Sequence, residues 1–102
     1  MSMPIYSPPR RRMRLLQYLS VSDWPIGAPL LLTLLRGDTT ADLADVLRAL
    51  IWLEDAGLAD VRTIDVTEHA VVHARITPRG REYLAGDDVL RGIERPGGVP
   101  HG

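Results

Sequence analysis

Arginine is the residue type in this chain whose chemistry points most clearly to a partner. All twelve basic residues are arginines, and Arg10, Arg11, Arg12 and Arg14 stand close together in the segment PPRRRMR. A guanidinium group binds phosphate or carboxylate through paired hydrogen bonds, and a flexible run of arginines can enter a DNA minor groove or follow the phosphates. The run therefore indicates contact with nucleic acid, although a GC-rich coding sequence gives the same preference for arginine without selection for binding.

The charges of the chain are unevenly distributed, which restricts where a polyanion could bind. Residues 1–36 carry five arginines against one aspartate, a net charge of +4, whereas residues 38–68 carry eight acidic residues against two arginines, a net charge of −6. The rest of the chain has a net charge of +1. Because neutralised phosphates supply much of the affinity for DNA, the N-terminal segment is the better candidate for this contact.

His69 and His73 are close enough in sequence to suggest a metal site. On a strand, however, a spacing of four residues separates the two side chains by roughly 13 Å, which is too far to share one ion. The chain has no cysteine, no glycine-rich phosphate loop and no grouping of serine, histidine and an acid that would serve catalysis. We expect no metal, no cofactor and no enzymatic activity.

The hydrophobic segments are too short for a membrane span. The longest apolar run lies within residues 30–35 and is interrupted by Thr33, whereas a transmembrane helix needs about 20 apolar residues. The N-terminal arginines are followed by an amphipathic segment without a small-residue cleavage pattern, so a secretory signal is not expected. We predict a soluble cytoplasmic protein.

A small α+β domain in which helices dominate must position these side chains. The hydrophobic periodicity and the turn residues predict the order helix, helix, helix, strand, strand, helix. A flexible arm, residues 1–9, precedes the domain at residues 10–86, and a tail rich in glycine and proline, residues 87–102, follows it. The predicted helices span about residues 10–20, 29–36, 40–57 and 78–85, and the predicted strands span residues 59–66 and 70–76.

Thr77 explains how the last strand passes directly into the last helix. Residues 70–76 place apolar side chains at every second position, the period expected of a strand with one buried face. The hydroxyl of Thr77 can then cap the following helix, and Pro78 suits the first helical position. In the same way, Thr39 or Thr40 is predicted to cap the third helix.

The third helix is predicted to bury one face and to expose the other. Apolar residues recur along it at intervals of three and four, which places the buried stripe at Leu43, Val46, Leu47, Leu50 and Leu53. The opposite face then carries Asp45, Arg48, Ala49, Trp52 and Asp55. An exposed Trp52 would indicate a protein interface, because tryptophan is enriched at binding hot spots. Alternatively, Trp52 packs under the hairpin or the tail.

Two segments outside the regular elements also carry predictions. Trp24, beside Pro25 in the first connector, is expected to anchor the core. The tail is expected to lack fixed structure unless Val89, Leu90 and Ile93 dock on the domain.

The segment LIWLEDAGLADV, followed by the predicted hairpin and then by ITPRGREYL, resembles the winged helix domains of bacterial regulators of the arsenical-repressor and multiple-antibiotic-resistance types. In those domains a Leu-x-x-x-Gly-Leu pattern ends the recognition helix, the hairpin forms the wing, and a Thr-x-x-Gly segment opens the last helix. The turn TPRG and the tail LRGIERP look more like the small winged helix proteins of Mu-like phages and prophages. The resemblance implies a winged helix fold with a two-stranded antiparallel wing.

The resemblance also implies a DNA-binding surface, because winged helix regulators place the third helix in the major groove and the wing on flanking DNA. The residues carried over by position are Thr39, Thr40, Asp42, Asp45, Arg48 and Ala49 on the helix, and Arg62, His69, His73 and Arg75 on the hairpin. The helix offers one arginine against several carboxylates, which oppose phosphates. The N-terminal arginines are therefore the alternative contact.

Two functions of different classes follow. The leading hypothesis is a transcriptional regulator that binds double-stranded DNA as a dimer, with helix one and the tail supplying the dimer contacts. The alternative is a winged helix adaptor that binds a protein through Trp52 and the acidic third helix. The surface around the third helix distinguishes the two, because basic density favours DNA, whereas exposed apolar area with an acidic rim favours protein.

Overall fold

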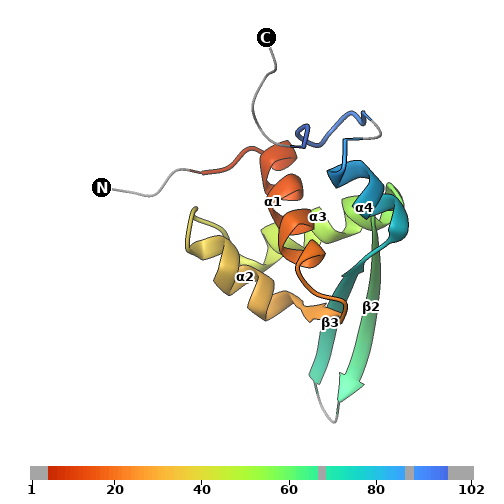
Figure 1. The fold of residues 1–102 in the computed structure, drawn as a ribbon. Helices are drawn as coiled ribbons and strands as arrows, with labels where there is room; N and C mark the ends of the chain where they lie inside the picture. Colours follow the sequence, from red (N-terminus) through yellow and green to blue (C-terminus); the bar gives the residue numbers. More distant parts are fainter. Residues whose placement is uncertain (1–4, 67–68, 87–88, 97–102) are drawn as a thin grey trace.

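The computed structural model describes residues 5–66, 69–86 and 89–96, and within them it contains four helices and a three-stranded antiparallel sheet (Figure 1). The elements are α1 (Pro8–Ser20), β1 (Ile26–Gly27), α2 (Ala28–Arg36), α3 (Leu43–Asp55), β2 (Ala59–Val66), β3 (His69–Ile76) and α4 (Pro78–Leu84). The predicted α+β class is confirmed, as is the predicted order of the helices and the two hairpin strands. β1 is an additional strand.

The sheet has the order β1-β3-β2, and β3 pairs with β2 along its whole length. Alternation decides its faces, as the sequence predicts: Ala74 and Ile76 are buried, whereas Arg75 between them is exposed. β1 joins the other edge of β3, where Ile26 lies opposite Ala74. The expected two-stranded sheet was incomplete because a strand of two residues is too short to show alternation in the sequence.

The core lies between the helices and the base of the sheet. Figure 1 shows α1 in front of α3, with α2 and α4 to either side and the β2–β3 hairpin extending away from the helices. Leucines of α1, α2, α3 and the following loop supply most of the fully buried volume: Leu15, Leu16, Leu19, Leu31, Leu35, Leu50, Leu53 and Leu58. No helix of the described residues is long and apolar enough to cross a membrane.

The start of α4 confirms the prediction for Thr77. Its hydroxyl oxygen accepts a hydrogen bond from the N–H of Gly80 at 3.0 Å, and the same hydroxyl donates to the carbonyl of Gly57 at 2.6 Å. The Thr77 N–H donates to the carbonyl of Leu58 at 3.1 Å. Gly80 lies so close to this carbonyl that an added Cβ would be 2.3 Å from its oxygen. The TPRG segment thus ties α4 to the loop that follows α3.

The start of α3 differs from the prediction, because its N-cap is Asp42 rather than Thr39 or Thr40. The Asp42 carboxylate accepts a hydrogen bond from the Asp45 N–H at 2.8 Å, and the Asp45 carboxylate accepts one from the Asp42 N–H at 3.0 Å. This reciprocal capping box satisfies the backbone N–H groups of Asp42 and Asp45, whereas a single threonine side chain would satisfy only one N–H group.

Three predictions of burial are wrong. Ala49 is 4% exposed although it was placed on the outer face of α3, and Leu43 is 42% exposed although it was placed on the inner face. Both α1 and α2 pack against α3, so the buried face of α3 includes Ala49 and is centred away from Leu43. Trp24 is 79% exposed, because Pro25 leads at once into β1 and leaves the preceding residue in solvent.

Both ends of the chain carry more structure than predicted. The N-terminal arm is shorter, because α1 begins at Pro8. In the tail, Ile93 is 6% exposed and Leu90 is half-buried, whereas Val89 is exposed. Residues 87–88 and 97–102 of the predicted tail lie outside the described residues. The tail therefore docks through two of the three residues named for that purpose.

Candidate functional site

The surface where α2, α3 and β3 meet is a shallow groove lined entirely by apolar residues. We call it the α2–α3–β3 groove, and it is formed by Ala28, Pro29, Leu43, Leu47, Ala70, Val71 and Val72. None of these side chains carries a charge or a hydrogen-bonding group. The side chains of the groove can therefore make apolar contacts but no ionic contacts.

The groove continues along α3 as a line of apolar side chains, which we call the α3 stripe. Leu43, Leu47 and Ile51 follow one another at intervals of four residues, so they lie on one side of the helix. Leu43 is 42% exposed, Ile51 is 56% exposed and Leu47 is half-buried. Single exposed apolar residues are common, but a contiguous set of them marks an interaction surface.

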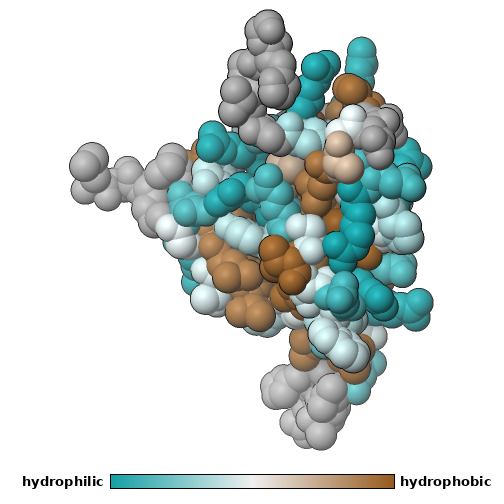
Figure 2. All heavy atoms as spheres, viewed as in Figure 1, coloured by the Kyte–Doolittle hydropathy of each residue, from teal (hydrophilic) through white to brown (hydrophobic). Residues whose placement is uncertain are grey.

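Leu30 and Leu34 are further exposed apolar residues, on α2. They are 55% and 40% exposed and lie one turn apart. Thr33 is the polar residue beside them, and its hydroxyl is already satisfied because it donates to the carbonyl of Pro29 at 3.1 Å. Figure 2 shows hydrophobic side chains gathered over α2 and beside the end of α1.

Three of the four charged residues of α3, Asp45, Arg48 and Glu54, are held by contacts within the chain. The Asp45 carboxylate, already part of the capping box, also accepts a hydrogen bond from Arg48 at 2.8 Å. The bond from the Asp42 N–H, followed by that from Arg48, lowers the pKa of Asp45. At the other end of the helix, Glu54 accepts a hydrogen bond from the N–H of Val61 at 3.2 Å. With three acidic residues and one arginine, α3 has a charge of −2.

The N-terminal arginines predicted to contact DNA lie on α1, the first of the predicted helices. Arg14 hydrogen-bonds to Asp38, which raises the pKa of Arg14 and lowers that of Asp38. Arg11 donates to the carbonyl of Tyr6 at 3.3 Å and lies 3.8 Å from the Asp45 carboxylate. The helix therefore fixes these guanidinium groups against acceptors of the same chain.

Tyr6 connects two further predicted contacts to the start of the chain. The guanidinium of Arg10 lies 4.7 Å from the centre of the Tyr6 ring, and the Tyr6 N–H donates to the hydroxyl of Thr39 at 3.1 Å. Thr39 is 1% exposed, so it cannot contact DNA, whereas Thr40 is exposed. Of the two threonines named as DNA contacts, only Thr40 is therefore accessible.

Trp52 is half-buried and packs under the tail, which is one of the two alternatives that the sequence left open. The Arg12 guanidinium lies 4.6 Å from the centre of its ring, within cation–π distance, and donates to the carbonyl of Gly92 at 2.6 Å. Burial, followed by the charge of Arg11, lowers the pKa of Arg12. Trp52 is thus covered by its own chain and is not an exposed interface residue.

One pocket brings three of the predicted DNA contacts together. Arg11, Arg12 and Arg48 line it with Asp45, Pro8 and Ala49, and we call it the α1–α3 arginine pocket. Three guanidinium groups against one carboxylate leave an excess of positive charge. Each of these arginines nevertheless has an acceptor within the chain, as described above, so a ligand would compete with existing contacts.

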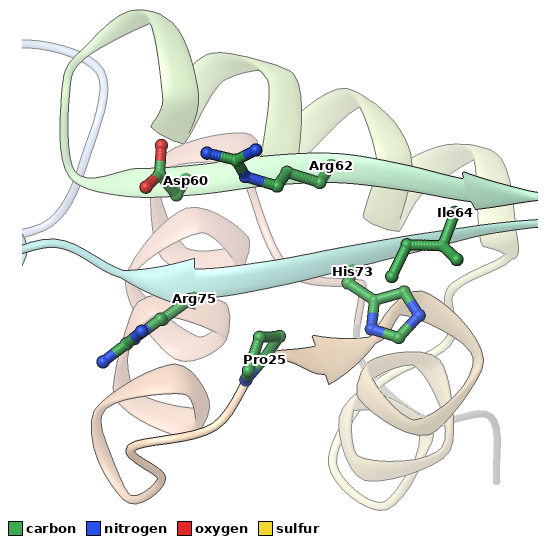
Figure 3. Close-up of a pocket in the computed structure, with 6 residues that line it drawn as sticks. All are labelled: Pro25, Asp60, Arg62, Ile64, His73 and Arg75. Carbon is green, nitrogen blue, oxygen red and sulfur yellow. The ribbon is translucent and has the colours of Figure 1, made fainter.

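The exposed face of the hairpin forms another pocket, shown in Figure 3. Arg62 and Arg75, both predicted wing contacts, line it with Asp60, Ile64, His73 and Pro25. The strand register places Asp60 opposite Arg75 and Arg62 opposite His73. This face therefore carries charges of both signs. The side chain of His69 lies outside the described part of the structure, where no three metal-ligating residues come together.

The sequence missed the α2–α3–β3 groove, although it contains a signal for it. Leu43, Leu47 and Ile51 keep an interval of four that drifts away from the buried stripe of α3, and Ile51 fits neither predicted face. Ala28, Pro29 and the residues of β3 join the groove only through tertiary packing, so their part in it produces no local pattern in the sequence.

No protein-family model matches this chain, and no curated protein matches it. Among solved structures, the chain is similar to the crystal structure of smu.1704 from Streptococcus mutans UA159, with a TM-score of 0.60 and 16% sequence identity. The match covers 79% of this chain and 77% of the other. At this identity the likeness shows a shared fold, so function must be argued from the surface itself.

Proposed function

We propose that this chain is a winged helix protein-interaction domain that self-associates through the α2–α3–β3 groove and the α3 stripe. The element order supports the fold assignment, because α2 and α3 precede an antiparallel hairpin whose strand β3 also pairs with β1. The tail LRGIERP supports a relationship to the small winged helix proteins of Mu-like phages and prophages. The observation that carries the function is that the residues lining the groove are all apolar.

The groove lies where a winged helix regulator would face DNA, between its second and third helices and its wing. DNA binding draws on neutralised phosphates and on hydrogen bonds to base edges. Leu43, Leu47 and Ile51 supply neither kind of contact, and the charge of −2 on α3 opposes phosphates. An apolar protein surface is the better complement.

A second copy of the chain meets the requirements of this surface. Because the residues of the groove and the stripe carry no charge themselves, two copies can bury these residues against each other in a two-fold symmetric interface. Such a pairing would bury the exposed parts of Leu43 and Ile51, where apolar burial contributes about 25 cal/mol per Å². This interface replaces the predicted one through helix one, whose Met13, Leu16 and Leu19 are buried in the core.

A second candidate function, double-stranded DNA binding by a transcriptional regulator, rests on the α1–α3 arginine pocket. Its excess positive charge could hold a backbone phosphate, with Arg62 and Arg75 on the hairpin as further contacts. This candidate requires Arg11 and Arg48 to give up their contacts with Asp45. It therefore ranks below protein interaction.

Titration of the protein into labelled mixed-sequence duplex DNA at several salt concentrations separates the two candidates. Protein interaction predicts weak binding that Arg48→Ala leaves unchanged, together with self-association that Ile51→Glu weakens in size-exclusion chromatography. Regulatory DNA binding predicts that Arg48→Ala lowers the salt slope by about one, while Ile51→Glu has no effect on the oligomeric state.

A further inference from the structure

The C-terminal residues 89–96 lie across α1, α3 and α4, in a place that does not involve the α2–α3–β3 groove. Figure 1 shows this segment passing from the end of α4 to the start of α1. Ile93 is its most buried residue, 6% exposed, and it joins the hydrophobic core. Leu90 is half-buried against the same core. The segment thus occupies a groove of its own.

This groove holds the backbone of the segment at three points. Arg12 donates to the Gly92 carbonyl at 2.6 Å, and the Tyr83 hydroxyl donates to the Glu94 carbonyl at 2.6 Å. In the opposite direction, the Glu94 N–H donates to the Pro9 carbonyl at 3.3 Å. Because all three bonds reach main-chain atoms, they select a backbone path and leave side-chain identity to the apolar contacts.

Gly92 is the residue that the groove selects most sharply. Its φ of +92° lies in the left-handed region that favours glycine. A Cβ added to it would lie 2.8 Å from Cζ2 of Trp52 and 3.2 Å from a guanidinium nitrogen of Arg12. Trp52 and Arg12 are stacked on each other at 4.6 Å, so neither can retreat without losing that contact.

We propose that the groove formed by Pro9, Arg12, Trp52 and Tyr83 is a peptide-binding site, with the chain's own residues 90–94 as its tethered ligand. The ligand class is a peptide that turns at a left-handed glycine and carries a half-buried apolar residue before it and a buried aliphatic residue after it, in the pattern Leu-x-Gly-Ile. The same segment supplied as a separate peptide fills the site when the tether is displaced. This site does not use the α3 stripe and stands whether or not the chain self-associates there.

Trp52 reports on the groove in a full-length protein that carries Trp24→Phe, because the chain has two tryptophans. In this background, Gly92→Ala should displace the segment, shift the emission of Trp52 to longer wavelength and increase its quenching by acrylamide. Gly86→Ala is the matched control, since Gly86 has the same φ of +92° but no atom within 4 Å of an added Cβ. It should leave the Trp52 signal unchanged.

Circular dichroism checks that both variants keep their helices. If Gly92→Ala unfolds, Tyr83→Phe supplies a milder displacement, because it removes the hydrogen bond to Glu94 and keeps the ring. It should shift the Trp52 emission in the same direction by a smaller amount.

The separate peptide VLRGIERP, residues 89–96, should reverse the emission shift when it is added to the Gly92→Ala protein. Half-saturation is expected at or below about millimolar peptide, since a short tether supplies an effective concentration of that order and the tethered segment is docked at it. The peptide with Gly92→Ala should fail to bind, and the peptide with Arg91→Ala should bind normally, because Arg91 is exposed. Equal Trp52 signals in Gly92→Ala and Gly86→Ala, or equal effects of the parent and Gly92→Ala peptides, would overturn the proposal.

Discussion

Replacing Thr77 with valine should destabilise the fold by about 2 kcal/mol. Valine keeps the branched shape and the preference for extended backbone but removes the hydroxyl. Loss of the cap on the Gly80 N–H costs about 1 kcal/mol. Loss of the hydrogen bond to the Gly57 carbonyl, 2.6 Å long and partly buried, costs about 1 kcal/mol more. For a domain of this size the midpoint of thermal unfolding should fall by about 10 °C.

Urea unfolding followed by far-ultraviolet circular dichroism measures this loss directly. Thr77→Ser is the control, because serine retains the hydroxyl and should recover most of the stability. The denaturant slope should be the same in all three proteins, since the surface exposed on unfolding does not change. A Thr77→Val protein within about 0.5 kcal/mol of the parent, a margin typical of surface substitutions, would show that the hydroxyl does not stabilise the junction, as would a Thr77→Ser protein equally destabilised.

Three further predictions concern the cap of α3, the packing of Gly80 in α4 and the ion pairs of Asp38 and Asp45. Asp42→Ala should lower the free energy of unfolding by about 1 kcal/mol, measured in urea, because it removes the N-cap of α3; an unchanged midpoint would contradict the capping box. Gly80→Ala should cost roughly 1–3 kcal/mol or more, because its Cβ would meet a backbone carbonyl; full stability would show that α4 can shift freely. Asp38 and Asp45 have lowered pKa values in the folded protein, so their stabilisation is present at neutral pH and is lost as the pH falls below about 4 toward their folded pKa values. Asp38→Asn should reduce the fall in the midpoint of thermal unfolding that accompanies acidification. An unchanged fall would contradict the stabilising contact between Asp38 and Arg14.

The features that the sequence predicted correctly are those decided within a few residues. Thr77 and Pro78 mark a strand-to-helix junction by their own chemistry, and alternation along residues 70–76 identifies the buried face of β3. The order of helices and hairpin strands follows from the same local patterns. Asp42 carried an equally local signal, since Asp45 stands three residues after it, but two threonines just upstream competed for the same role.

The features that the sequence could not supply depend on contacts between distant segments. The burial of Ala49 depends on where α1 crosses α3, and Thr39 is buried because the Tyr6 N–H reaches its hydroxyl. The sequence could not show that the N-terminal arginines are paired within the chain, because their acceptors, including Asp38 and the Gly92 carbonyl, lie far away along the chain. The apolar groove is likewise assembled from three separate elements.

The apolar groove and the α3 stripe make Ile51 the most informative single position. Ile51 is 56% exposed, so roughly half of its side chain is free to be buried, a contribution of about 1 kcal/mol in each copy. Glutamate at this position also brings a carboxylate from each copy to the interface. The dissociation constant of the dimer should therefore rise by roughly 10-fold to 100-fold.

Sedimentation velocity over a range of protein concentrations tests this claim most directly, with Ala85→Glu as a control that adds the same charge at an exposed position outside the groove and the stripe. If the dimer forms through Ile51, the parent and Ala85→Glu proteins form dimers at similar concentrations, and Ile51→Glu remains monomeric until the concentration is at least roughly ten times higher. A parent protein that stays monomeric throughout, or an Ile51→Glu protein that dimerises like the parent, would contradict the proposed interface.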